Sequence, residues 1–300
     1  MDLGTNTFHL LIARGTAASY EEIVHKSLPA KLGEGGINKG LIIPAAFERG
    51  LDAMQQYEQD IVNSSVDSVR AVATSALRNA ANGQEFIEKV KELTGISIEL
   101  INGEQEAGYI YKGVKLTGGL SAQTSLIMDI GGGSVEFILC NADEIFWKQS
   151  FEIGAARLMD KFHQADPIPA SSVNDLHSYL DEKLTPLFEA CKQNSVDTII
   201  GSSGSFETFA EIIELDKRKP FDLKNIKNYA FKTEELVAVT DKLIASSHQQ
   251  RKTMEGIVSI RVDMIVVASL LTRFVMERLN TINVQLCTNS LKEGILADML

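Results

Sequence analysis

Two acidic residues flank a glycine turn near the middle of the chain. Asp129 ends the apolar run 126–128, and Glu136 lies on the alternating stretch that leaves the turn. Because glycine has no Cβ, the backbone between them can adopt φ > 0, and its N–H groups can approach a polyanion closely. Carboxylate oxygens bind Mg²⁺ and can organise water. The pattern predicts a phosphate-binding loop formed by Gly131, Gly132, Gly133 and Ser134. From these residues alone, an ordinary glycine-rich hairpin is an equal alternative.

A second copy of the pattern opens the chain. Residues 2–12 (DLGTNTFHLLI) align without a gap on residues 129–139 (DIGGGSVEFIL). A repeat at half-chain spacing predicts two domains of like topology that face one cleft, each with a phosphate-facing hairpin. His9 occupies the position of Glu136, so we expect only the second copy to carry a water-activating acid. The first loop supplies the predicted phosphate contacts Gly4, Thr5, Asn6 and Thr7.

Two strand-to-helix junctions take corresponding places in the two halves. A small-residue strand at 69–73 ends at 74–78 (TSALR), and a buried strand at 198–200 ends at 201–205 (GSSGS). Helix N-termini after such strands bind anions well. The sequence predicts further phosphate contacts from Arg78, Gly201, Ser202, Ser203, Gly204 and Ser205. A surface position for Arg78 and an ordinary helix cap at 201–205 are the alternatives.

Glu104 and Glu106 lie on a predicted helix that follows the break at Asn102-Gly103. Residues two apart on a helix point to different faces, so only one of these acids can face the cleft. The polar, glycine-rich segment 117–121 comes next and predicts a linker between the halves.

The strands and helices that hold these residues are predicted from apolar alternation. Residues 8–13 form a strand that turns at 15–19 and returns through 20–28, and residues 135–139 and 145–151 repeat this arrangement. A helix that starts at Pro44 covers the first sheet. The strongly apolar stretch 261–279 predicts a buried helix of the second half.

Composition places the chain among globular proteins. Its 300 residues are 44% hydrophobic and 23% charged, which is ample for two packed domains. The net charge of −11 argues against nucleic acid as a partner. We see neither a membrane-spanning stretch nor a signal segment, so we expect a cytoplasmic protein. The three cysteines predict buried, reduced thiols. In the second copy an apolar strand (126–128) runs into Asp129, whereas only Met1 precedes Asp2. We therefore also expect a few residues before Met1.

Four stretches together resemble one protein family. These are DLGTNTFHLLI (2–12), ATSALRNAAN (73–82), INGEQEAGYIYKGV (101–114) and DIGGGSVEFIL (129–139). The segments GSSGS (201–205), RVD (261–263) and SLKEGILADML (290–300) extend the likeness to nearly the whole chain. The set is similar to the exopolyphosphatase and guanosine-pentaphosphate phosphatase family, within the actin-like ATPase superfamily.

The resemblance implies an α/β fold of two actin-like (ribonuclease H-like) domains, with mixed sheets flanked by helices and the active site in the interdomain cleft. Domain I is expected at 1–119, with the C-terminal helix 289–300 packing back on it, and domain II at 120–288. Longer relatives carry an added helical domain, so this chain resembles the short form.

The resemblance also implies roles for single residues. Glu106 matches the catalytic glutamate, Asp129 and Glu136 match acids that bind metal and organise water, and Arg78 matches an arginine that contacts phosphate. The implied cofactor is Mg²⁺, with Mn²⁺ as its substitute, and the implied assembly is a homodimer without membrane or nucleic-acid partners. The sequence departs from the family pattern at Gln105, where glutamate is common, and at Lys292, where arginine is usual.

We therefore expect an exopolyphosphatase that hydrolyses terminal phosphate from linear inorganic polyphosphate, using Mg²⁺ and a water activated by Glu106. The first alternative is a guanosine pentaphosphate 5′-phosphohydrolase, because both substrates present the same terminal anhydride. The second is a non-hydrolytic actin-like nucleotide-binding or assembly protein, which would not need Glu106.

Overall fold

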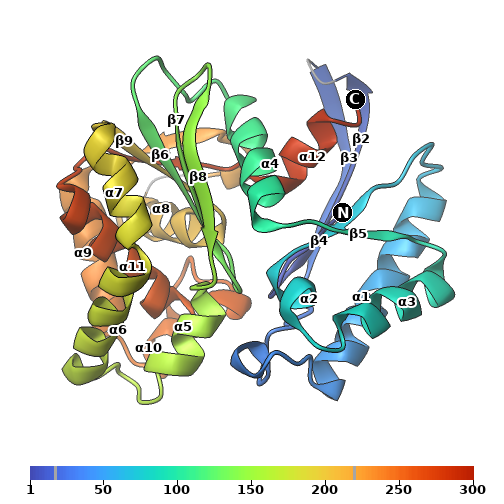
Figure 1. Cartoon of the computed structure of the whole chain (residues 1–300), viewed down its shortest axis with the longest axis horizontal. Coiled ribbons are helices and arrows are strands. Elements are labelled where there is room, and N and C mark those ends of the chain that lie inside the picture. The colour runs from blue at the N-terminus through green and yellow to red at the C-terminus, as the bar shows by residue number, and fades with distance from the viewer. Residues whose placement is uncertain (17–18, 219–220) are drawn as a thin grey trace.

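Two mixed sheets form the framework of the protein (Figure 1). The computed structural model describes residues 1–16, 19–218 and 221–300, so part of the turn expected at 15–19 lies outside the described residues. The first sheet has the strand order β3-β2-β1-β4-β5, and the second has the order β10-β11-β9-β6-β7-β8. The predicted α/β class with mixed sheets is confirmed. The strands are β1 (Asp2–Leu3), β2 (Phe8–Thr16), β3 (Ser19–Leu28), β4 (Ala71–Ala73), β5 (Ile98–Leu100), β6 (Ser125–Ile130), β7 (Val135–Cys140), β8 (Ile145–Phe151), β9 (Thr198–Ser202), β10 (Asn228–Ala230) and β11 (Val284–Cys287).

The repeat in the sequence is also a repeat of strand topology. In the first sheet, β1 lies between the antiparallel β2 and the parallel β4. In the second sheet, β6 lies between the antiparallel β7 and the parallel β9. The register agrees as well, because Asp2 pairs with His9 and Asp129 pairs with Glu136. The gap-free alignment of the two loops therefore joins equivalent positions in two sheets, as predicted.

Three helices pack against the first sheet. They are α1 (Pro44–Asn63), α2 (Ser75–Asn79) and α3 (Gly83–Thr94), preceded by the 3-10 turn η1 (Ile37–Lys39). Pro44 begins α1 at a position where its missing N–H has no helical partner to lose. Tyr57 of α1 is fully buried in one cluster with Phe8 and Phe86, and its hydroxyl donates to the Phe8 carbonyl at 2.6 Å. This packing fixes β2, the strand that carries His9.

The helices of the second half pack against one face of the second sheet. They are α5 (Ala155–Phe162), α6 (Ala170–Lys183), α7 (Thr185–Gln193), α8 (Gly204–Asp216), α9 (Thr233–Ala245), α10 (His248–Thr253) and α11 (Ile265–Leu279), with 3-10 turns η2 (Leu223–Asn225) and η3 (Ser259–Arg261). The predicted buried helix is confirmed as α11, whose Val266, Leu271 and Val275 are fully buried. It begins at Ile265 instead of residue 261, because residues 259–261 form η3.

A pair of helices, α4 (Gly103–Lys115) and α12 (Leu291–Ala297), lies between the two halves (Figure 1). They pack closely, because a Cβ on Gly113 would lie 2.0 Å from the Ser290 carbonyl oxygen. Their apolar cluster includes Ile127 of the second sheet and Val72 of the first. The domain division at residue 119, with 289–300 on domain I, stays a prediction, and the structure shows α12 against α4.

No helix within the described ranges is long and apolar enough to cross a membrane. The predicted reduced thiols are found as free, buried cysteines at Cys140, Cys191 and Cys287.

Candidate active site

A row of four polar side chains crosses the second sheet. Ser202 of β9, Asp129 of β6, Glu136 of β7 and Ser150 of β8 are successive cross-strand partners. Directly opposite residues in a sheet point to the same face, so the row forms one polar strip. The Ser202 hydroxyl donates to Asp129, and the Ser150 hydroxyl donates to Glu136 Oε1 at 2.6 Å. Strand register therefore places the two acids side by side and holds each with a hydroxyl.

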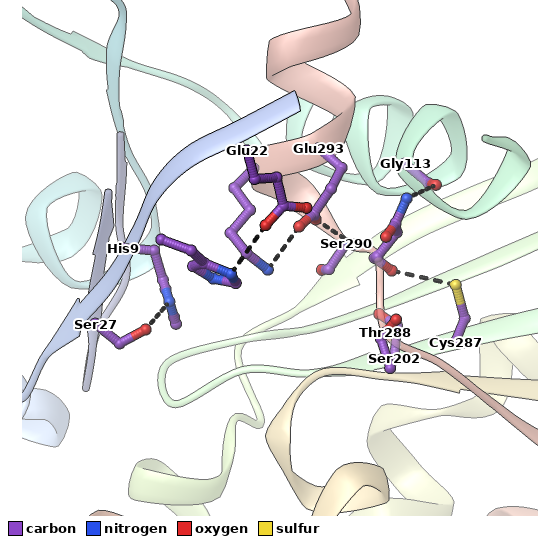
Figure 2. A network of polar contacts seen from close by, with 12 residues as sticks. His9, Glu22, Ser27, Gly113, Ser202, Cys287, Thr288, Ser290 and Glu293 are labelled. Carbon is purple, nitrogen blue, oxygen red and sulfur yellow. Dashed lines mark hydrogen bonds and ion pairs between the residues drawn. The ribbon is translucent and has the colours of Figure 1, made fainter. Parts of the chain in front are cut away.

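The first sheet carries the matching row. Val72, Asp2, His9 and Ser27 are its successive partners. His9 Nδ1 lies 2.8 Å from Ser27 Oγ. Figure 2 shows this contact, which takes the place of the one between Glu136 and Ser150. Burial lowers the pKa of His9 well below its usual value, and nearby positive charges lower it further, so the imidazole is neutral. The predicted inequivalence of the two copies is confirmed.

Asp2, His9 and Ser27 of the first row line one cavity of about 540 Å³ together with Asp129 and Glu136 of the second, so the predicted cleft between the halves exists. Among the predicted site residues, those that line it are Gly4, Thr5, Asn6, Thr7, Glu106, Asp129, Gly131, Gly132, Gly133, Ser134, Glu136, Ser203, Gly204 and Ser205. Three predicted phosphate contacts, Arg78, Gly201 and Ser202, are not among the described residues that line it.

Gly201 and Ser202 each have another contact. A Cβ on Gly201 would lie 2.2 Å from the Phe206 ring, so glycine is needed there for packing. Ser202 is fully buried and bonds Asp129. That these two residues bind phosphate stays a prediction. Ser203 lines the cavity with φ 74° and ψ 174°, a backbone region that is costly for a residue with a side chain, and its hydroxyl donates to the Ile130 carbonyl at 2.9 Å.

The central glycines are needed for close approach and not for a left-handed backbone. None of Gly131, Gly132 and Gly133 is among the described glycines with positive φ, so the expected φ > 0 is wrong for this turn. A Cβ on Gly133 would lie 2.5 Å from both Thr5 Oγ1 and Ser75 Oγ. The two halves thus meet at this loop with no room for a side chain.

Glu106 is the acid of α4 that faces the cavity. The helix begins with a capping box, in which the Asn102 and Gln105 side chains each bond the other's backbone N–H at 2.9 Å. Gln105 is thereby occupied, which gives the departure from the family pattern a structural role. Glu106 is 6% exposed, whereas the Glu104 side chain is 61% exposed. The prediction that the two acids face different sides is confirmed.

Arg78 contacts Glu106 from outside the cavity lining. Its Nη1 lies 3.1 Å from Glu106 Oε2 and also donates to the Ile101 carbonyl at 3.0 Å. Its Nη2 lies 3.2 Å from Glu152 Oε1. Burial raises the pKa of Glu106 well above its usual value and the charge of Glu136 raises it further, while Arg78 opposes both effects. The phosphate contact of Arg78 stays a prediction.

Sequence reasoning missed Glu152, which joins the halves next to this pair. It accepts a hydrogen bond from the Ser75 hydroxyl at 2.7 Å and an ion pair from Arg157 at 2.9 Å. Arg157 Nε also donates to the Gly133 carbonyl at 2.8 Å, which ties the phosphate loop to α5. No sequence motif marks Glu152 or Arg157. Of the residues that contact the acids, only Ser150 could have been found from the sequence, because it lies on the strand predicted at 145–151.

The acids fit a divalent cation. Ser202 and Ser290 both donate to Asp129 Oδ2. Burial raises the pKa of Asp129, and burial and the Asp129 charge raise the pKa of Glu136 to about 8. Asp2 Oδ1 is buried and lacks a hydrogen-bond partner among the described residues. The positive charges near these carboxylates do not offset the effect of burial, because all three pKa values stay raised. A bound cation would supply the missing positive charge.

The described residues contain no group of three His, Cys, Asp or Glu side chains spaced to hold a metal by themselves. Mg²⁺ does not require such a group, because it keeps several waters and usually takes one or two carboxylates together with phosphate oxygens of a substrate. The residues present therefore fit Mg²⁺ better than an ion that needs a closed protein cage.

Comparisons with known proteins show the fold and the family of this chain. A solved exopolyphosphatase from Cytophaga hutchinsonii ATCC 33406 is 38% identical, with a TM-score of 0.96, 99% of this chain and 96% of that chain being covered. A Ppx/GppA protein from Aquifex aeolicus has the same fold at 24% identity, with a TM-score of 0.80 over 99% of this chain and 95% of that chain. The predicted actin-like fold is confirmed.

A curated relative, a guanosine-5′-triphosphate,3′-diphosphate pyrophosphatase of Vibrio vulnificus (strain YJ016), is 30% identical over 213 residues. The match covers 71% of this chain and 43% of that protein, so the chain spans less than half the length of this relative. The model of the Ppx/GppA phosphatase family matches residues 11–300. Because the match runs through both sheets and to the last residue, this chain belongs to the Ppx/GppA phosphatase family.

Proposed function

We propose that the protein is an exopolyphosphatase that hydrolyses the terminal phosphoanhydride of linear inorganic polyphosphate. The observation that carries the proposal is the meeting of Glu106, Asp129 and Glu136 in one cavity that is also lined by glycine loops from both halves. Phosphoryl transfer needs a positioned nucleophile and neutralised phosphoryl oxygens, and little covalent chemistry from the protein. Glu106 can position the nucleophile, and a cation held by Asp129 and Glu136 together with the glycine-loop N–H groups can neutralise the phosphoryl oxygens.

Glu106 acts as general base in this proposal. The oxygen of a water molecule attacks the terminal phosphorus, Glu106 accepts the water's proton, and the bond from phosphorus to the bridging oxygen breaks. The products are inorganic phosphate and a chain one unit shorter. A base that works near neutral pH benefits from a pKa above that of a free carboxyl, and burial raises the pKa of Glu106 in this direction.

The remaining residues position the reactants. Ser150 holds Glu136 through its hydroxyl, so this carboxylate can orient the attacking water. The backbone N–H groups of the two glycine loops hold the terminal phosphate. Asp129 and Glu136 would hold Mg²⁺, which neutralises the negative charge on the phosphoryl oxygens when it is bound.

The choice of polyphosphate rests on the 38% identical relative, which is named an exopolyphosphatase and is covered over nearly its whole length. The test is phosphate release from long-chain polyphosphate, guanosine pentaphosphate and ATP at equal Mg²⁺ and equal concentration of terminal phosphate. Polyphosphate should give the highest kcat/KM. Faster phosphate release from guanosine pentaphosphate would reject the exopolyphosphatase and favour a guanosine pentaphosphate 5′-phosphohydrolase.

A guanosine pentaphosphate 5′-phosphohydrolase is the second candidate function. The observation in its favour is the 30% identical relative from Vibrio vulnificus, which carries that type of name. An actin-like assembly protein is the third. It would bind ATP without needing Glu106 and would form ATP-dependent filaments in sedimentation.

We also propose that the protein forms a homodimer, as the family resemblance implies. The apolar helix α11 is not the dimer surface, because its apolar residues are buried within the second half. Light scattering at micromolar concentration should give twice the mass of one chain, and a monomer mass would reject the dimer.

A further inference from the structure

The cavity has one lysine among the described residues that line it, Lys292. None of the steps above uses this residue. It lies in the first turn of α12, its side chain is 14% exposed, and its ammonium group lies 3.0 Å from Glu293 Oε1. A lysine at this depth needs acceptors for its donors.

The start of α12 fixes the position of this lysine. Glu293 Oε2 accepts the backbone N–H of Ser290 at 2.8 Å, as part of the capping box that begins the helix, and Figure 2 shows these two residues side by side. Glu293 is 3% exposed and does not line the cavity. The Ser290 hydroxyl donates to Asp129. The same helix start therefore holds Lys292 on one side and the proposed metal ligand on the other.

Lys292 acts on the acids of the cavity through its charge. Burial raises the pKa of Asp2 and of Asp129, and the Lys292 charge opposes this rise in both. Burial lowers the pKa of Lys292 itself, but the charges of Glu293, Glu207 and Asp2 outweigh burial and raise it above its usual value. The side chain is therefore a fixed cation at neutral pH.

The arginines near the cavity already have partners. Arg261 lies 2.7 Å from Glu207 and donates to Thr208 at 3.1 Å, and Arg78 pairs with Glu106 and Glu152. An ammonium group has three donors. Glu293 is the one ion-pair partner of Lys292 within the described part of the chain. Because Lys292 lines the cavity, the donors of its ammonium group that Glu293 does not take suit an anionic ligand.

We propose that Lys292 binds a phosphate group of the substrate. Lys292 lines the same cavity as Glu106 and the glycine loops. Its ammonium group has one ion-pair partner among the described residues, Glu293, so its other donors remain for a phosphate oxygen. The assignment deepens the proposed function and rests on it, because it requires a phosphate-bearing substrate in this cavity.

Equilibrium binding of inorganic tripolyphosphate tests this assignment without hydrolysis. Calorimetric titration is done with the Glu106→Gln protein, in which turnover is suppressed, at fixed Mg²⁺ and ionic strength. Adding Lys292→Gln should weaken binding by roughly 10- to 100-fold, the value of a hydrogen bond to a charged group. Adding Lys292→Arg, which keeps the charge, should retain most of the affinity.

Lys112→Gln is the matched control. Lys112 also pairs with an acid of the C-terminal segment, Asp298, at 2.6 Å, but it is 48% exposed and does not line the cavity. Its removal should leave the affinity unchanged. Thermal unfolding of each variant separates loss of binding from loss of folding.

Unchanged affinity in Lys292→Gln would reject Lys292 as a phosphate contact while the proposed function stands. An equal loss in Lys112→Gln or in Lys292→Arg would reject it too, because the effect would then not come from a charge inside the cavity. If the Glu106→Gln protein with Lys292 intact binds no tripolyphosphate, the proposed function fails and this assignment fails with it.

Discussion

Arg78 Nη1 lies 3.1 Å from Glu106 Oε2, which joins the first half of the molecule to the proposed general base. Arg78 sits in the last turn of α2, and Glu106 in the first turn of α4. Because the arginine side chain is 18% exposed, this pair is only weakly screened by solvent. Arg78 therefore holds the base in place and lowers its pKa against the larger, opposite effect of burial.

Glu106→Gln should lower kcat by roughly 10²- to 10⁴-fold, because general-base catalysis contributes about that factor. Substrate binding should persist, since the glycine loops are unchanged. Steady-state phosphate release measures the effect. Glu104→Gln is the control and should behave as wild type, because its side chain is 61% exposed. A crippled Glu104→Gln together with an active Glu106→Gln would show that the wrong acid was assigned.

Arg78→Met should move the acidic limb of the kcat/KM profile to higher pH. The base works in its ionised form, and Arg78 lowers the pKa of Glu106. Removing the arginine raises that pKa, so ionisation requires a higher pH. The profile of phosphate release between pH 5 and 10 measures the shift. Arg70→Met is the control, because Arg70 pairs with Glu99 and Tyr109 instead. A shift to lower pH would contradict the assigned role of Arg78.

Glu136→Gln should stabilise the metal-free protein at alkaline pH. Burial and the Asp129 charge raise the folded-state pKa of Glu136 to about 8 from 4.5. Between these values the folded state holds a proton that the unfolded state has lost, so the free energy of unfolding falls as pH rises, by about 1.4 kcal/mol for each pH unit. Glutamine removes this penalty. The Tm in chelator should therefore exceed that of wild type at pH 9, with a smaller difference at pH 4.5.

For this comparison, Glu104→Gln serves as the exposed control and should show the same Tm as wild type at both pH values. A Glu136→Gln protein that is less stable than wild type at pH 9 would show that the carboxylate is not destabilising in the folded state.

Asp129→Asn should raise the Mg²⁺ concentration needed for half-maximal activity, because it removes a charged oxygen ligand. Mn²⁺ titration followed by electron paramagnetic resonance gives a second readout that does not depend on turnover. Asp143→Asn, at an exposed position of the same half, is the control and should change neither value. Equal Mn²⁺ affinity in wild type and Asp129→Asn would remove Asp129 from the metal site.

Gly113→Ala should destabilise the protein by about 1 to 3 kcal/mol, the usual cost of overpacking. Its Cβ would lie 2.0 Å from the Ser290 carbonyl oxygen, so α12 must move away from α4. Activity should fall as well, because Ser290 donates to Asp129. Gly108→Ala on the same helix is the matched control. Its Cβ would meet only the flexible end of Lys148 at 3.3 Å, so denaturant unfolding should show no loss.

The sequence by itself was enough to find the two loops and their acids. Alternation of apolar residues and a gap-free repeat are local properties, and β-strand geometry converts them directly into a face and a register. The pairing of Asp2 with His9 and of Asp129 with Glu136 follows from the alignment of the two copies. Placing Glu106 on the cavity side needed only helix geometry and the family resemblance.

The tertiary structure decided which groups surround those acids. Ser202 lies on β9, and its contact with Asp129 depends on register with β6, a strand that is not adjacent to β9 in sequence. The hydrogen bond from Ser290 to Asp129 spans 161 positions, and Arg78 is paired with Glu106 across 28. Such contacts depend on how α2, α4 and α12 pack around the sheets. The hydrogen-bond partners, the burial and the pKa of each acid therefore follow from the tertiary structure and not from the local sequence.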